Sequence, residues 1–364
     1  MPRVLFFFGQ KMGKIIGLTY DLKTDWKLRP DDPADANAEL DSGETLDFVV
    51  QALETIGHRV KKIGNIKNLL AEIEGLDVDI VFNICEGYHG RNRESQVPLI
   101  LEMYGIPCVG SDALTLGVTL DKILAKKCFI ADGIPTPRYF EAWGKEDLKT
   151  LAKKNKMRFP MIVKPKHEGS SKGLSEKSRV TDFEGLKRQV DLINQKYHQA
   201  ALVEEFIRGS EFTVPVLGNK NPQAMPVAQV HLDGNVNLGD NFYTHARLSY
   251  DGLGYVCPPK ISAKLNKKLQ ELAVKAYQSV GCLDFGRVDF RVDEKDEPFV
   301  LEINPLPSLA KKDVFNIFPY VMGSTFEKTI SQIVNFALER YGLLGGRNRS
   351  SSSNISRPTA NAAK

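Results

Sequence analysis

Cysteine is scarce in this sequence, and the few cysteines that occur form no recognisable pattern. The chain of 364 residues has five of them, and none belongs to a CxxC pair. An odd and dispersed set argues against both a disulfide framework and a zinc site. Each lies among apolar neighbours, as is typical of a small buried side chain. We therefore expect a protein of the reducing cytoplasm.

Long apolar runs are also missing. No stretch of the sequence reaches the roughly 18 apolar residues that a membrane-spanning helix needs. The apolar run at residues 4–8, VLFFF, is too short for the core of a signal peptide and has no small-residue cleavage site after it. We interpret this run as a first buried strand, and we expect no membrane association.

The sequence has no large excess of charge of either sign. Its 49 basic and 45 acidic residues give a net charge of +4, which is too balanced to indicate a nucleic-acid partner, and no nucleic-acid-binding motif is present. The content of 42% hydrophobic and 26% charged residues is typical of a globular protein. A chain of this length predicts two or three domains.

The first hundred residues alternate between strand and helix patterns. Such alternation predicts an α/β fold with a parallel sheet and helices on its faces. Ligands in such sheets bind at the carboxyl ends of the strands, which here would hold residues 9–13 and 85–94. The expected strands are 4–8, 59–63 and 79–84, and the expected helices are 44–56, 66–73 and 97–104.

The rest of the chain predicts further α/β structure and two polar segments. Residues 24–41 are acidic and contain proline, so we expect a solvated insertion rather than a functional lid. The tail at 345–364 is rich in Ser, Asn and Ala and should be disordered. The other expected helices are 121–131, 182–195, 263–280 and 321–341, and the other expected strands are 161–164, 201–206 and 211–217.

Residues 286–307, GRVDFRVDEKDEPFVLEINPLP, predict two strands joined by a polar turn. Side chains two apart on a strand share a face, so Arg287 lies with Asp289, and Glu302 lies with Asn304. A hairpin would gather a guanidinium, two carboxylates and an amide on one face. Oxygen ligands of this kind suit Mg²⁺ bound to a nucleotide. An ordinary hairpin with surface charges is the alternative.

Residues 164–173, KPKHEGSSKG, predict a strand that delivers Lys164 into a polar loop. Gly169 lets the backbone approach an anion closely, and Ser170 and Ser171 add hydroxyl donors. The pattern differs from the GxxxxGK[ST] phosphate loop, which excludes that nucleotide-binding fold. A flexible surface turn has a similar composition and remains an alternative.

Residues 202–212, LVEEFIRGSEF, carry carboxylates at both sides of a glycine hinge. Glu204 ends an apolar strand, and Glu211 begins the next one. The apolar strand and the carboxylates together suit the base and the ribose of a purine nucleotide. A pair of strands with surface acids would look the same.

These three segments, in this order, resemble the ATP-grasp superfamily, and the resemblance to the D-alanine–D-alanine ligase family covers about residues 79–320. Its most specific motifs are GIPCVGS, LDKILAKK, GIPTP, KPKHEGSSKG, EEFIRGSEFTV, GRVDF and LEINPLP. The resemblance implies a parallel-sheet domain followed by a two-part ATP-grasp domain. The expected divisions are 1–111, 112–217, 218–342 and a tail at 343–364.

The resemblance also implies roles for individual residues, and it implies ATP as co-substrate with two Mg²⁺ ions (or Mn²⁺). Arg287 would stabilise the charge that develops on the substrate carbonyl oxygen, and Ser170 and Ser171 would close over the reacting groups. Asp289, Glu302 and Asn304 would bind the metal ions. ATP would be held by Lys122, Lys164, Gly169, Glu204, Phe206, Ile207 and Glu211.

The departures from the family fall on the amino-acid side. Residues 9–13 lack the usual glutamate, Glu86 replaces the usual histidine, and Ser308 ends an altered segment after the metal ligands. Residues 245–249, HARLS, replace the family's Lys-Tyr pair. Glu86 or Glu94 is therefore our hypothesis for the residue that holds the ammonium of the first substrate, because both follow a predicted strand end.

The implied activity is an ATP-dependent ligase that joins two amino acids through an acyl phosphate, most simply two D-alanines for peptidoglycan synthesis. The altered loops leave open the same chemistry on a different amino acid or hydroxy acid. A non-catalytic ATP-binding sensor is a further alternative, although it would have no use for the full catalytic set. Small amino acids are the expected partners, and family members are commonly homodimers.

Overall fold

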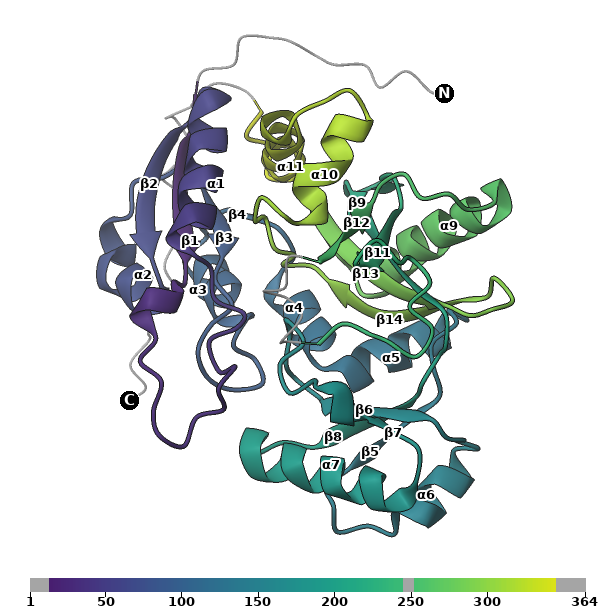
Figure 1. The fold of residues 1–364 in the computed structure, drawn as a ribbon. Coiled ribbons are helices and arrows are strands. Elements are labelled where there is room, and N and C mark those ends of the chain that lie inside the picture. Colours follow the sequence, from purple (N-terminus) through teal and green to yellow (C-terminus); the bar gives the residue numbers. More distant parts are fainter. Residues whose placement is uncertain (1–12, 245–251, 345–364) are drawn as a thin grey trace, which may run out of the picture.

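The computed structural model describes residues 13–244 and 252–344, which form three β-sheets and the helices that cover them (Figure 1). The predictions for residues 4–8, 245–249 and 345–364 lie outside the described residues, as do residues 9–12 of the predicted first loop.

The first sheet is parallel, with the strand order β2-β1-β3-β4. The predicted strand–helix alternation is confirmed, and the predicted strands and helices of this part that lie within the described residues agree with the structure to within one residue. The strands are β1 (Ile15–Tyr20), β2 (Arg59–Gly64), β3 (Ile80–Ile84) and β4 (Cys108–Val109), and the helices are α1 (Gly43–Thr55), α2 (Ile66–Glu72) and α3 (Gln96–Met103).

Strand β1 is a correction, because the sequence analysis assigned no strand to residues 15–20. Gly17 interrupts the apolar run there and weakens the strand pattern. The structure explains this glycine, since a Cβ at Gly17 would lie 2.7 Å from Cδ1 of Ile63 and 3.2 Å from Cγ2 of Val81. The loop after the first described strand is 21–41.

The second sheet is antiparallel, with the order β5-β8-β6-β7, and helices α6 and α7 pack on one of its faces (Figure 1). Helices α4 and α5 lead into it from the first sheet. The strands are β5 (Tyr139–Ala142), β6 (Met161–Pro165), β7 (Arg179–Val180) and β8 (Ala201–Glu205), and the helices are α4 (Ala113–Leu120), α5 (Lys122–Ala131), α6 (Leu148–Lys154) and α7 (Phe183–Tyr197).

The third sheet is the largest and has the order β12-β11-β9-β13-β14, with β10 beside β9. Helix α9 (Ala263–Ser279) packs its apolar side on β9, β13 and β14 to form a separate core. The strands are β9 (Ser210–Leu217), β10 (Gln223–Ala224), β11 (Ala228–Leu232), β12 (Leu253–Val256), β13 (Phe285–Val292) and β14 (Pro298–Asn304).

Two helices replace the single C-terminal helix predicted over 321–341. Helix α10 (Val314–Val321) is followed by Gly323 at φ +66°, and Thr325 caps the start of α11 (Phe326–Arg340). Apolar residues recur at helical spacing on both sides of the turn, so the sequence pattern did not reveal where the first helix ends and the second begins. Both helices share one apolar core with the first sheet and α1, so the C-terminal end of the described chain packs against its N-terminal domain.

Neither membrane helices nor disulfides contribute to this fold. Within residues 13–244 and 252–344, no helix is long and apolar enough to span a membrane. All five cysteines have free thiols, and Cys85, Cys108 and Cys282 are buried.

Candidate active site

A cavity of about 460 Å³ lies where the three sheets meet. Its lining includes the end of β14, the loop after β6, the end of β3 and the segment before α1. Of the predicted site residues, thirteen line this cavity and Glu204, Phe206 and Ile207 do not. The thirteen are Glu86, Glu94, Lys122, Lys164, Gly169, Ser170, Ser171, Glu211, Arg287, Asp289, Glu302, Asn304 and Ser308.

Strands β13 and β14 form the predicted hairpin, and their register brings the four polar residues together. Arg287 pairs with Asn304, and Asp289 pairs with Glu302. The Asp289 carboxylate accepts hydrogen bonds from Nε and an NH2 of Arg287 at 3.0 and 2.9 Å and from the Asn304 amide at 2.9 Å. The Thr213 hydroxyl on β9 donates to it at 2.6 Å. The predicted shared face is confirmed.

Lysines from two other elements approach the same hairpin. The Lys122 ammonium at the start of α5 lies 2.9 Å from Oε2 of Glu302. Burial alone would raise the pKa of Glu302, but the charges of Lys122 and Lys164 bring it down to about 2. Glu302 is therefore ionised at neutral pH and available as a ligand for a cation.

Glu204 lies behind the cavity and not in its wall. Its side chain is 1% exposed, and its two carboxylate oxygens pair with Lys126 and with Lys164, the latter at 2.5 Å. Burial raises the pKa of Glu204, and the two lysines lower it by more, so that it stays ionised. Glu204 therefore positions the Lys164 ammonium.

A second buried ion pair lies at the hinge after β8. Glu211 accepts from Arg291 at 2.8 Å, and Arg291 also donates to the carbonyl of Ile207 at 2.9 Å. The guanidinium carbons of Arg179 and Arg291 lie 5.1 and 5.0 Å from the centroid of the Phe206 ring. Arg291 was not predicted as a site residue. The signal in the sequence was its spacing of two from Asp289, which puts both side chains on the same face of the strand.

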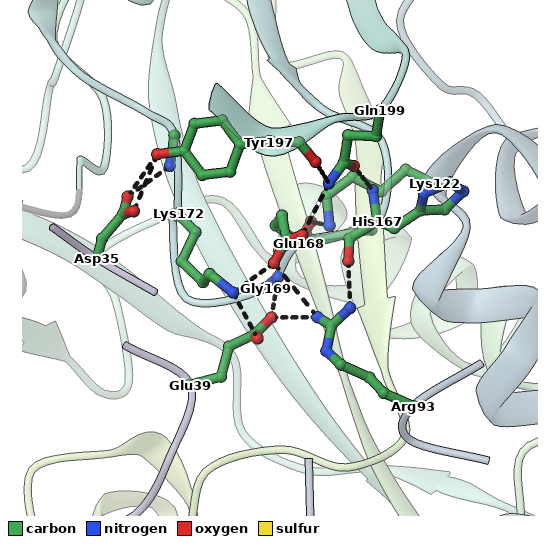
Figure 2. Close-up of polar contacts among 12 residues, drawn as sticks. Asp35, Glu39, Arg93, Lys122, His167, Glu168, Gly169, Lys172, Tyr197 and Gln199 are labelled. Carbon is green, nitrogen blue, oxygen red and sulfur yellow. Dashed lines mark hydrogen bonds and ion pairs between the residues drawn. The ribbon is translucent and has the colours of Figure 1, made fainter. Parts of the chain in front are cut away.

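The Gly/Ser loop at 166–174 packs against residues 35–41 of the segment at 22–41 (Figure 2). Residues 24–41 were predicted to be a solvated insertion. Residues 24–34 are mostly exposed, but the prediction is wrong for residues 35–41. Glu39 has a side chain only 5% exposed, lies 2.6 Å from Arg93, and accepts from the backbone N–H of Gly169. It also lies 3.1 Å from the Lys172 ammonium. Acidic composition indicated solvent exposure, but Glu39 meets two buried cations.

Asp35 makes a second attachment between these two segments. Its carboxylate accepts from the N–H of Gly173 at 2.8 Å and from the Tyr197 hydroxyl at 2.9 Å (Figure 2). The two serines of the loop, Ser170 and Ser171, adopt φ values of +45° and +54°. Such left-handed residues are uncommon outside glycine and cluster at functional sites.

Glu86 and Glu94 lie where the hypothesis placed them, in the cavity wall after β3. Burial raises the pKa of both, to about 7 for Glu94, and their mutual repulsion raises that of Glu86 further. Ser308 is exposed at the rim. No group of three His, Cys, Asp or Glu residues suited to a metal ion occurs in the described part of the chain, so the predicted set depends on the Asn304 amide.

Comparisons with known proteins identify the family. The sequence profile described as "D-ala D-ala ligase C-terminus" matches residues 129–335. A D-alanine–D-alanine ligase of Janthinobacterium is 35% identical over 74% of this chain and 82% of that protein. An uncharacterized protein of Sinorhizobium fredii, y4sG, is 34% identical over 83% of this chain and 91% of its own length. The chain belongs to the D-alanine–D-alanine ligase family.

Solved structures of this family share the fold. The D-alanine–D-alanine ligase from Bacillus anthracis in complex with ATP has a TM-score of 0.70 at 20% identity, covering 92% of this chain and all of that one. The VanG D-Ala:D-Ser ligase of Enterococcus faecalis has a TM-score of 0.67 at 20% identity, covering 90% and 100%. The α/β ATP-grasp prediction is confirmed, and the chain is an ATP-dependent ligase that forms carbon–nitrogen bonds.

Proposed function

We propose that this ligase joins two amino acids through an acyl-phosphate intermediate. One observation carries the proposal: the register of β13 and β14 places Arg287, Asp289, Glu302 and Asn304 in a cavity that Lys122 and Lys164 also line. Cations and carboxylates in this arrangement suit the transfer of a phosphoryl group, which depends mainly on neutralising charge.

The chemistry follows from the poor reactivity of a carboxylate. An oxygen of the first substrate's carboxylate attacks the γ-phosphorus of ATP, and the bond from that phosphorus to the bridging oxygen breaks to release ADP. The amine of the second substrate, after losing a proton from its ammonium form, attacks the acyl carbon. The bond from carbon to the phosphate oxygen then breaks, which yields an amide and inorganic phosphate.

Each cluster of the site has a role in this scheme. Lys122 and Lys164 bind ATP phosphates, and Arg287 stabilises the tetrahedral oxyanion, a contribution of about 100-fold in rate for one such donor. Glu211 faces the ribose, and the loop with Ser170 and Ser171 excludes water. Asp289, Glu302 and Asn304 fit Mg²⁺ because they offer carboxylate and amide oxygens toward the cavity, and Mg²⁺ would neutralise phosphate charge there.

The identity of the amino acids is the finer part of the proposal. D-alanine is the reference substrate, because the relatives are named for it, and D-alanyl-D-alanine would serve peptidoglycan synthesis. Glu86 or Glu94 holds the ammonium of the first substrate. A different amino acid is the second candidate, and it is favoured by Asp41, Glu86 and Glu94, three carboxylates of the cavity lining that have no ion-pair partner among the described residues.

Release of ADP and phosphate from Mg·ATP tests the proposal. Purified protein is mixed with single amino acids and with pairs, in D and L forms, and products are identified by mass spectrometry. We expect ADP release that depends on an added amino acid and matches the dipeptide formed. Amino-acid-independent ATP binding without turnover across the panel would refute the ligase proposal and favour a sensor.

An Arg287→Met variant separates chemistry from binding in the same assay. It removes the oxyanion donor, so kcat falls about 100-fold or more, while ATP still binds through Lys122, Lys164 and Glu211. A matched control is Glu297→Gln in the exposed turn of the same hairpin, where the carboxylate pairs only with Lys268. Equal activity of Arg287→Met and the control would contradict the assigned role.

A further inference from the structure

Nine carboxylates line the cavity, and six of them already have a cationic partner. Glu39 is held by Arg93 and Lys172 (Figure 2), which leaves it no capacity for a substrate ammonium. The six paired carboxylates are those of Glu39, Glu168, Glu211, Asp289, Glu302 and Asp313.

The other three are Asp41, Glu86 and Glu94, and they lie together at the end of the cavity nearest the first sheet. Their side chains make no hydrogen bond or ion pair with the residues that the structure describes. Glu94 is only 8% exposed and still lines the cavity. Arg93 and Lys122 lower its pKa from a distance, but Glu39 and Glu302 occupy those cations. A buried carboxylate without a partner is costly, and this indicates a cationic ligand.

The three carboxylates suit an organic cation better than a metal ion, because nothing in the described part of the chain shows that they converge on one point. No group of three acidic, histidine or cysteine side chains in the described ranges converges closely enough for a metal, so the three carboxylates present separate binding points. Lys23 is the one cavity-lining cation of the described residues without an ion pair. Three carboxyl groups against one lysine leave two without a cationic partner, and an α-ammonium supplies one.

We propose that one of the joined amino acids carries a second cationic group besides its α-ammonium, and that Asp41, Glu86 and Glu94 bind these two charges. This inference rests on the proposed ligase function and narrows its substrate to the diamino acids and similar basic amino acids. A site built to pair with a polar group strongly rejects an analogue that lacks it, because its own buried polar groups are then left unpaired.

Calorimetric binding and ADP release with matched amino acids test this inference. Ornithine and 5-hydroxynorvaline have the same length and differ in the charge of the terminal group; 2,4-diaminobutyrate and homoserine form a shorter pair. Each is titrated, in D and L forms, into the full chain with Mg²⁺ and a non-hydrolysable ATP analogue. We expect the charged member of at least one pair to bind at least about tenfold more tightly.

Variants assign the preference to the carboxylates. Glu94→Gln keeps the shape of the side chain and removes its charge, so the charged-to-neutral affinity ratio should fall severalfold while the affinity for the ATP analogue stays the same. Asp41→Asn provides a second test if Glu94→Gln does not fold. The control is Glu54→Gln on the exposed side of α1, which should keep the wild-type ratio.

The outcomes separate this inference from the proposed function. Tight ornithine binding without ADP release would support the cationic site and refute the ligase function. ADP release and dipeptide formation with alanine alone, with no preference for charged amino acids, would support the ligase and overturn the inference. Equal affinity for the charged and neutral members of both pairs would also overturn it.

Discussion

At the scale of single residues, the site depends on carboxylates whose charge is set by what surrounds them. Lys122 and Lys164 keep Glu302 ionised at one end of the cavity, whereas Glu94 at the other end has no close partner. A glutamate side chain is therefore an ionised ligand for a cation at one end of the cavity. At the other end, without a ligand, it keeps its proton up to a pH of about 7.

Glu302→Gln should reduce kcat about 100-fold or more, because it removes a charged metal ligand from the phosphoryl-transfer site. In the wild type, the depressed pKa of about 2 means that Glu302 stays ionised as pH falls toward 4. The wild-type profile of kcat/KM for ATP should therefore show no acid limb from this group between pH 5 and 8. Activity in Glu297→Gln should remain at the wild-type level, and equal loss in both would contradict the assignment.

Glu94→Gln should stabilise the ligand-free protein at pH 8 and have little effect at pH 5. Burial raises the folded pKa of Glu94 to about 7, above that of a free carboxyl. The folded state then binds more protons than the unfolded state between these values, so Glu94 costs stability as pH rises through that range. The gain at pH 8 should be on the order of 1–3 kcal/mol. Urea unfolding at both pH values measures it, and a pH-independent difference would contradict the raised pKa.

The residues found from strand alternation, without the family resemblance, are those whose partners lie on the same hairpin. Strand alternation alone placed Arg287, Asp289, Glu302 and Asn304 on one face, because the two strands are close in sequence and their faces repeat every second residue. Glu39 could not be found in this way. Its partner Gly169 is 130 positions away, and no local pattern reports a contact over that distance.

At the scale of elements, the segment at 22–41 acts as a cover that is fixed to the Gly/Ser loop. Glu39 and Asp35 attach it at two points, through Gly169 and Gly173. Helices and strands were predicted well because their apolar periods are strong, but the segment has no such period. Its structure comes from the polar contacts that Glu39 and Asp35 make with other elements. Its polar composition therefore indicated solvent exposure, although these two side chains are buried.

Glu39→Gln should uncouple ATP hydrolysis from amide formation. The change removes the charge that holds Arg93 and Lys172, leaves two buried cations without their partner, and loosens the cover so that water reaches the acyl phosphate. We expect the ratio of phosphate released to dipeptide formed to rise severalfold above one. Asp31→Asn, an exposed position on the same segment, is the control. An unchanged ratio in Glu39→Gln would show that the segment does not exclude water.

At the scale of the whole molecule, the first and third sheets are joined at a buried carboxylate. Asp284 is fully buried and adopts φ +62° just before β13. It accepts hydrogen bonds from the N–H of Gly110 after β4 at 2.8 Å, from Asn219 after β9 at 2.9 Å, and from Arg340 on α11 at 2.7 Å. One side chain thus holds the end of the first sheet, the third sheet and the last helix in register.

This junction could not be predicted from sequence, because its members come from four separate parts of the chain. Asp284 precedes the hairpin that carries the metal ligands, while Gly110 follows the sheet that carries Glu86 and Glu94. The position of one end of the cavity relative to the other therefore depends on Asp284. Its loss should affect the stability of the whole molecule as well as the geometry of the site.

Asp284→Asn should destabilise the protein by about 3 kcal/mol, because Arg340 loses its buried charged partner and cannot shed its own charge. Asparagine tolerates a positive φ, so the variant removes the charge without adding backbone strain. Urea unfolding followed by fluorescence and by circular dichroism measures the change. Asp47→Asn, whose carboxylate is 75% exposed and pairs with Lys62 on the surface, should alter stability by less than about 1 kcal/mol. If the two variants unfold at the same urea concentration, Asp284 is not the residue that joins the sheets.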